Sequence, residues 1–152
     1  MATEMLAPAV ARYVLSMRVL GLMYAGAALF FFFLPEAVFY LLNFLPKFFG
    51  VLAVIPDSSE QFWLPLATSM MVMLTLLAFG AASAPENRML AYVHLASKLC
   101  SSAGYLYLFL FRAPMFASLV GVITDLPIFC YVLWITLQAS RALAKQPEQP
   151  AP

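Results

Sequence analysis

Charged side chains are scarce in this 152-residue chain, at 10% of the residues, and the net charge at pH 7 is only +1. Soluble domains carry ~25% charged residues, so the scarcity excludes an ordinary soluble domain. The small net charge gives no reason to expect nucleic acid as a partner. Hydrophobic residues make up 64% of the chain, and the mean hydropathy is +0.92. The composition therefore predicts an integral membrane protein.

Residue types that build catalytic and metal sites are also few. A single histidine, His94, provides no bis-histidine pair for haem, and Cys100 and Cys130 form no CxxC or Cys/His cluster, so haem and zinc are disfavoured. The six glycines form no phosphate-binding loop. The methionine run "SMMVML" at 69–74 has ligands suited to copper(I), but we interpret it as core filling. No catalytic residue and no metal site is predicted.

Four windows meet the requirement for a spanning helix, which needs roughly 20 mostly apolar residues to cross ~30 Å of hydrocarbon. The short loops between the last three windows have room only for antiparallel neighbours. The sequence predicts an all-α integral membrane four-helix bundle within residues 13–138, with spans over 13–34, 62–82, 89–111 and 115–137.

Helix-start patterns precede three of these windows. Ser58 with Gln61 and Ser83 with Glu86 have the spacing of a capping box, in which two side chains bond the free amides of the first turn. Pro114 suits the first turn of the fourth window. These patterns predict where the last three helices begin.

The orientation follows from the basic residues, which are retained on the cytoplasmic side of membranes. With four spans, both termini and the 83–88 loop share one face, and the opposite face has only Lys47 and Arg112. We therefore predict that residues 1–12 and a disordered, Pro-rich tail, 139–152, are cytoplasmic. The basic residues of the cytoplasmic face are Arg12, Arg18, Arg88, Arg141 and Lys145.

The connector 35–56 is cut by three prolines into two pieces of about ten residues, and each would reach only ~15 Å as a helix. The first piece starts with Pro35 and Glu36, a helix-start pattern. We expect it to lie along the non-cytoplasmic interface. A re-entrant hairpin is the alternative, and a fifth span is disfavoured because it would separate the termini. The expected aromatic anchors are Phe39, Tyr40 and Phe44.

Lys98 lies near the middle of the third window, and five polar side chains of that window fall within an arc of about 100°. A lone charge at mid-bilayer costs at least ~2.5 to 3.5 kcal/mol, so this face must turn toward protein. Asp125 is the only acidic residue inside any window, and the two residues lie at comparable depths of ~14 and ~19 Å. We predict a buried Lys98–Asp125 ion pair. The residues on the polar face are His94, Lys98, Ser101, Ser102 and Tyr105.

Two interpretations of the pair stay open. It either fixes the register of the helices, or it belongs to an intramembrane polar pocket for a proton, an anionic lipid or a quinone headgroup. Pro127 cannot donate to the carbonyl of Ile123, which predicts a helix kink near Asp125. Arg18 either extends to the lipid headgroups or turns toward Asp125 or a bound anion.

A family resemblance rests on the overall plan of the chain. The first window opens "RYVLSMRVLGLMYAGAALFFFFLPE", an apolar connector follows, and "PENR" separates the second and third windows. In this plan the chain resembles the DoxX-like group of small four-helix bacterial membrane proteins. The resemblance implies a location in the bacterial inner membrane and a link to quinone-coupled redox complexes, and no catalytic residue is carried over from it.

A small chain with several spans and no soluble domain commonly docks against another membrane protein. The first functional hypothesis is therefore an accessory subunit or assembly factor of a larger membrane complex, with other subunits or a second copy as partners and the lipid bilayer around it. The second is a binding or transport protein that uses the pocket at Lys98 and Asp125. An enzyme is expected only in the sense of a non-catalytic subunit of a redox complex. No resident cofactor is predicted, and a quinone or a lipid is the candidate ligand.

Overall fold

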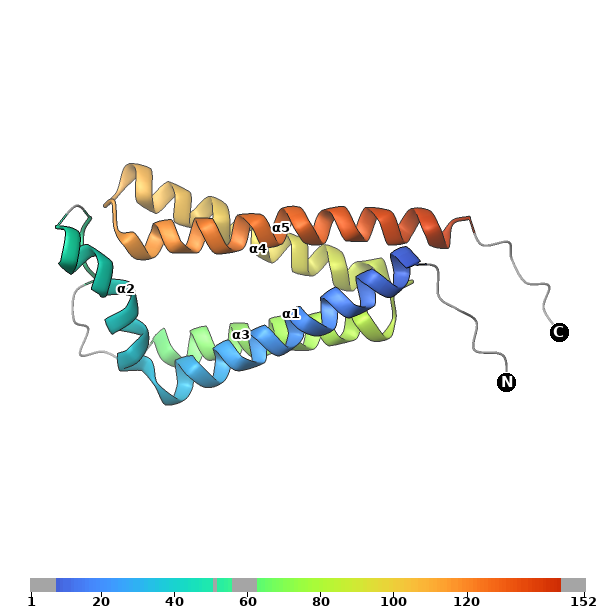
Figure 1. Ribbon diagram of the computed structural model, residues 1–152, viewed down its shortest axis with the longest axis horizontal. Coiled ribbons are helices and arrows are strands. Elements are labelled where there is room, and N and C mark those ends of the chain that lie inside the picture. Colours follow the sequence, from blue (N-terminus) through green and yellow to red (C-terminus); the bar gives the residue numbers. More distant parts are fainter. Residues whose placement is uncertain (1–7, 51, 56–62, 146–152) are drawn as a thin grey trace.

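The computed structural model describes residues 8–50, 52–55 and 63–145 (Figure 1). Three helices in this part, α1, α3 and α5, are long and apolar enough to cross a membrane, which confirms an all-α fold with candidate spans. The described helices are α1 (Pro8–Phe33), α2 (Pro35–Phe49), α3 (Trp63–Ser83), α4 (Arg88–Phe111) and α5 (Phe116–Leu143).

The helix α4 has the length of a span, with 24 residues, but it is not among the three that are apolar enough. Its polar residues, which include His94, Lys98 and two neighbouring serines, lower its mean hydropathy. The four-span bundle is therefore supported for three of its four helices by length and composition. The fourth crossing stays a prediction.

The four long helices form two antiparallel pairs. The closest packing is between α1 and α3 and between α4 and α5, with smaller contacts between α1 and α5 and between α3 and α4. Figure 1 shows the two pairs close together at the end where α1 starts and α5 finishes, called below the end near the termini, and apart at the opposite end, where α2 lies. This arrangement agrees with the antiparallel order that the short loops predict.

The buried core lies mainly in the half of the bundle near the termini. It combines larger side chains of α1 with small residues of α3, such as Ala78 and Ala81, which let the helices approach closely. Gly21 of α1 serves the same purpose, because a Cβ there would lie 3.0 Å from the ring of Phe79. In lipid such van der Waals packing is a main source of helix association. The largest fully buried side chains include Tyr13, Met17, Leu74, Ile135 and Val132.

The helix α2 begins as predicted, with Pro35 in its first turn and Glu36 beside it. The predicted break at Pro46 is wrong, because the helix continues to Phe49. Pro46 lies one turn before the end, so its missing N–H removes a single bond within the helix. The helix stops at Gly50, which adopts φ 66° and donates its amide to the carbonyl of Pro46 at 2.8 Å.

The chain after α2 is bonded to α2 itself and to the loop between α4 and α5. Asn43 is buried, and its side-chain amide bonds the backbone N–H and the carbonyl of Ile55 at 2.8 and 3.0 Å. The amide of Ala53 donates to the carbonyl of Pro114, before α5, at 3.2 Å. The predicted interfacial or re-entrant position of this connector stays a prediction.

The predicted aromatic anchors of α2 divide between two environments. The ring of Phe39 packs edge-on against Trp63 of α3, with centroids 5.0 Å apart. Tyr40 and Phe44 are exposed on the outer face of α2. Phe39 therefore holds α2 to the bundle, and the other two face its surroundings.

Several predicted boundaries need correction. The cap of α4 is Asn87, whose side chain accepts from the amide of Met89 at 3.2 Å, and not Ser83 with Glu86. Ser83 instead ends α3 and donates to a carbonyl of its own helix. Pro114 lies outside α5, which begins at Phe116. The expected cap of Ser58 and Gln61 lies outside the described residues.

The outer bounds of the helical part are wider than predicted. The helix α1 starts at Pro8, within the segment 1–12 that we assigned to a cytoplasmic terminus. The helix α5 continues to Leu143, so residues 139–143 are helical and not part of a disordered tail. The rest of that tail, 146–152, lies outside the described residues.

Candidate functional site: a buried ion pair between three helices

The predicted ion pair is present. The ammonium of Lys98 on α4 lies 2.7 Å from Oδ1 of Asp125 on α5, and the two side chains are only 4% and 14% exposed. Both residues lie well inside their helices, where lipid would otherwise meet two bare charges. The pair joins α4 to α5 with a charge-assisted hydrogen bond.

The second carboxylate oxygen of Asp125 is also bonded. The hydroxyl of Ser101 donates to Oδ2 of Asp125 and lies 3.1 Å from the carbonyl of Lys98. Its single hydrogen serves the carboxylate, because a charged acceptor makes the stronger bond. Each oxygen of Asp125 therefore has a partner from α4.

Tyr24 of α1 forms the third side of the site. The ammonium of Lys98 lies 4.9 Å from the centroid of the Tyr24 ring, a cation–π distance. The Tyr24 hydroxyl lies 3.2 Å from Nε2 of His94, and the two ring centroids are 5.5 Å apart. Sequence reasoning missed Tyr24, although it belongs to the buried stripe of α1 that also holds Tyr13 and Met17. That stripe is visible only in the structure, because apolar residues occur on every side of α1.

His94 is completely buried, and its Nδ1 has no hydrogen-bond partner among the described residues. A neutral imidazole has one donor and one acceptor nitrogen. The contact with Tyr24 uses only Nε2. One polar nitrogen is therefore left inside the bundle beside the ion pair.

Two other predicted residues lie next to the ion pair without bonding the carboxylate of Asp125. Ser102 is buried, and its hydroxyl donates to the carbonyl of Lys98 at 2.7 Å, a bond within the helix that leaves the carboxylate untouched. Tyr105 is 39% exposed, and its ring packs against Gly121 of α5 so closely that a Cβ there would lie 2.4 Å from it. The contact between Tyr105 and Gly121 brings α4 and α5 together next to the pair.

Arg18 does not join the site. It is exposed, and it forms no ion pair or hydrogen bond with another described residue, so the structure does not turn it toward Asp125. The helix α5 continues without interruption through Pro127, where the predicted kink stays a prediction. The site therefore consists of Lys98, Asp125 and Ser101, with Tyr24 and His94 alongside.

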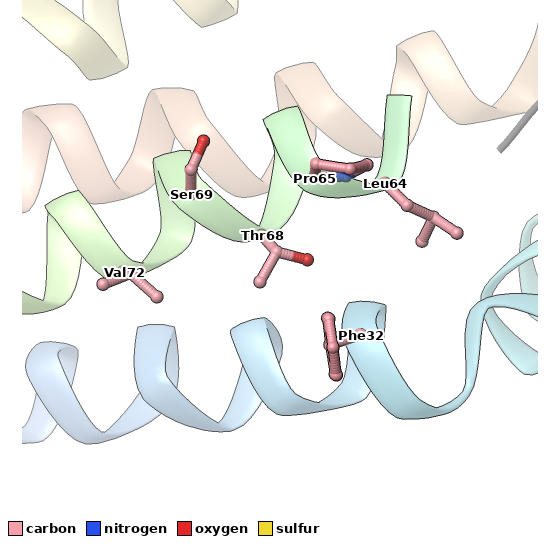
Figure 2. A pocket seen from close by; sticks show the side chains of 6 residues that line it. All are labelled: Phe32, Leu64, Pro65, Thr68, Ser69 and Val72. Carbon is pink, nitrogen blue, oxygen red and sulfur yellow. The ribbon is translucent and has the colours of Figure 1, made fainter. Parts of the chain in front are cut away.

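A separate cavity lies between α1 and α3 near the end where the helix pairs diverge (Figure 2). Its volume is about 720 Å³. Thr68 points toward α1, and its hydroxyl has no partner among the described residues, whereas Ser69 points away and bonds its own helix. Phe32 lines the cavity from the α1 side. None of the polar residues predicted from the sequence lines this cavity.

Comparisons with protein-family models, with characterised proteins and with solved structures give no match for this chain. The resemblance to the DoxX-like group stays an expectation from the sequence. The evidence for function is therefore the geometry of the ion pair and the distribution of polar and apolar surface around it.

Proposed function

We propose that this protein is a polytopic accessory subunit or assembly factor of a larger membrane complex. The observation that carries the proposal is that its buried charged groups pair with each other inside the bundle. Lys98, Asp125 and Ser101 bond one another, which favours a structural role for the pair. The surface that remains for partners is apolar.

The position of the polar residues on α4 supports a fourth crossing. His94, Lys98 and Ser102 are 0%, 3% and 4% exposed, so they contribute little to the lipid-facing surface. The outer face instead carries Leu99 and Leu110, which are 49% and 60% exposed. With 24 residues, the helix measures ~36 Å, enough for the hydrocarbon core. The mean hydropathy of α4 therefore underestimates how apolar its lipid-facing surface is, because its polar side chains face protein.

Exposed apolar side chains cover the outside of all four long helices. Examples that are at least 60% exposed are Leu22, Leu76, Leu110 and Ile123. Lipid covers such faces, and a larger membrane subunit can replace the lipid on part of them. A chain of this size whose buried charges are paired with each other has its outer surface as the main means of interaction.

The proposed location is the bacterial inner membrane, with both termini in the cytoplasm. The basic residues of α1 and α5 support this orientation, because Arg12 lies near the start of α1 and Arg141 near the end of α5, and these two helix ends lie at the same end of the bundle (Figure 1). Membership of the DoxX-like group, with its link to redox complexes, is part of the same proposal. The orientation is tested by fusing a reporter that is active only in the cytoplasm to each end of the chain; both fusions should be active. Three crossings would separate the termini, whereas four keep them together.

A second candidate function is favoured by one observation, the unpartnered Nδ1 of His94 beside the ion pair. A buried polar nitrogen next to ionised groups suits a site for a proton, an anionic lipid or a quinone headgroup. In this alternative, the protein is a binding or transport protein. The same residues then hold a ligand and do not only fix the helices.

Gentle detergent extraction of the tagged chain from its native membrane distinguishes the two. We expect co-migration with a larger complex at fixed stoichiometry. A monodisperse small particle that carries lipid or quinone would favour the alternative. The matched variant Lys98→Met with Asp125→Asn removes both charges, so the complex should persist if the pair is structural. Loss of function with the complex intact would support the ligand site.

A further inference from the structure

A groove of about 450 Å³ lies between α1 and α5, and neither residue of the ion pair lines it. Its walls are mostly apolar, with Leu15, Val19 and Met23 from α1 and Pro127 and Ile128 from α5. Val19 and Met23 are 48% and 58% exposed, so the groove opens to the surroundings of the helices. From Leu15 to Met23 it follows α1 for ~12 Å. Its shape and lining suit a hydrocarbon chain.

Two hydroxyls lie at the end of the groove nearer the termini. Ser16 of α1 and Tyr131 of α5 line the groove, and their oxygens are 2.7 Å apart. Each hydroxyl has one hydrogen to donate, and their mutual bond uses only one of the two. The second hydrogen is free for an acceptor such as an ester carbonyl.

A cation follows one helix turn beyond Ser16. The guanidinium of Arg12 lies 5.7 Å from the ring of Trp134, and its Nη1 donates to the side chain of Gln138 at 3.5 Å. Arginine has five N–H donors in a planar fork that matches a phosphate. Among the described residues only Gln138 bonds Arg12, so most of its donors can bind an external acceptor, while Trp134 and Gln138 hold its position.

The surrounding charge is positive. Arg141 lies three residues after Gln138, on the same face of α5, and it is exposed. The described part of α1 contains no acidic residue, and the one acid of α5, Asp125, is bonded to Lys98 on α4. An anion between Arg12 and Arg141 would reduce the repulsion between two like charges.

We infer that the groove between α1 and α5 binds an anionic phospholipid. Its phosphate bonds Arg12, its ester region meets the hydroxyls of Ser16 and Tyr131, and one acyl chain fills the groove. A basic cluster beside interfacial Trp and Tyr residues is the usual arrangement for anionic headgroups. The inference rests on the proposed orientation, which places Arg12 in the cytoplasmic leaflet.

The test uses the full-length chain, purified and stripped of lipid, with binding measured by native mass spectrometry. Phosphatidylglycerol should bind more tightly than phosphatidylcholine with the same acyl chains. Arg12→Gln should weaken phosphatidylglycerol binding about five-fold, the ratio that corresponds to ~1 kcal/mol per basic residue at a membrane surface. Arg88→Gln is the matched control, because Arg88 is also exposed and begins α4, and it should leave binding unchanged.

Two further variants separate the parts of the site. Val19→Trp fills the groove without changing the charge, and it should weaken phosphatidylglycerol binding while Arg12 is intact. Arg12→Lys keeps the charge, so it should retain a preference for the anionic lipid. Circular dichroism and gel filtration verify that each variant is folded.

Three results would overturn the inference: equal binding of the two lipids to the native chain, equal effects of Arg12→Gln and Arg88→Gln, or full competition by inorganic phosphate at the lipid's concentration. The last result would identify a site for free phosphate and not for lipid. The proposed function is tested separately, by the co-migration and reporter experiments described above. Those can fail while the purified chain still selects phosphatidylglycerol.

Discussion

The ammonium of Lys98 faces the ring of Tyr24 at 4.9 Å while it bonds Asp125 at 2.7 Å. Tyr24 belongs to the helix pair α1 and α3, and the other two residues belong to the pair α4 and α5. The contact therefore connects the two pairs, and not only two neighbouring helices. A cation–π contact away from water contributes ~2 kcal/mol or more, which is comparable to the other polar bonds of the site.

Replacement of Asp125 by Asn should destabilise the protein strongly. It leaves the buried Lys98 without its counter-charge, and breaking a buried pair costs ~3 to 5 kcal/mol. We expect low accumulation in membranes and a lower melting temperature in detergent. The added change Lys98→Met should restore both, because no charge is then left inside. Normal abundance of the single Asp125→Asn variant would contradict a stabilising pair.

Two changes at Tyr24 separate its hydroxyl from its ring. Tyr24→Phe removes the partner of His94 Nε2 and should cost ~1 to 3 kcal/mol, the penalty for an unsatisfied buried group. Tyr24→Leu also removes the cation–π contact and should cost more. Tyr107→Phe on α4 is the control, since Tyr107 is 52% exposed. The readout is thermal unfolding in detergent, and equal melting temperatures for all three variants would disprove the contact's importance.

Gly121→Ala should force α4 and α5 apart locally. The new Cβ would lie 2.4 Å from the Tyr105 ring, so the ring or the helix must move, at a cost of ~1 to 3 kcal/mol. Gly104→Ala has open space around it and should stabilise slightly, because alanine is the better helix former. Tyr105→Ala combined with Gly121→Ala should remove the clash. If Gly121→Ala and Gly104→Ala melt alike, the close approach is not present in the folded protein.

Gly50→Ala tests the end of α2. The left-handed φ of 66° disfavours a residue with a Cβ by roughly 1 to 2 kcal/mol. We expect earlier proteolysis of the connector after α2, with little change in the main unfolding transition. Gly50→Asn should be milder, because Asn tolerates this conformation. Gly26→Ala has open space and an ordinary helical backbone, so it is the control.

The ion pair could be predicted because charges are so rare in this chain. With one acid inside the four windows, Lys98 had a single candidate partner, and the regular rise of two antiparallel helices placed Asp125 at a comparable depth. The contact with Tyr24 has no such signal. Tyrosine is common in membrane helices, and only the packing of α1 decides that its ring faces Lys98.

Other parts of the fold depended on competition between local signals. Pro46 predicts a break, but the bonds of Asn43 to Ile55 and the cap at Gly50 stabilise the helix around it. At the start of α4, both Ser83 and Asn87 are good caps. Ser83 is the last residue of α3 and bonds a carbonyl of that helix, so Asn87 is the N-cap of α4. Such choices are decided by neighbouring elements, which a local pattern does not contain.

The uneven distribution of the core has a consequence for how the protein opens. Amides deep in the half near the termini, around Met17 and Ile135, should exchange with deuterium slowly, because tight packing surrounds them. Amides near Ala53 depend on a few bonds such as the one to Pro114 and should exchange sooner. The backbone at the α2 end would then open locally more often than the backbone at the opposite end. Unfolding would therefore begin at the α2 end while the opposite end is still folded.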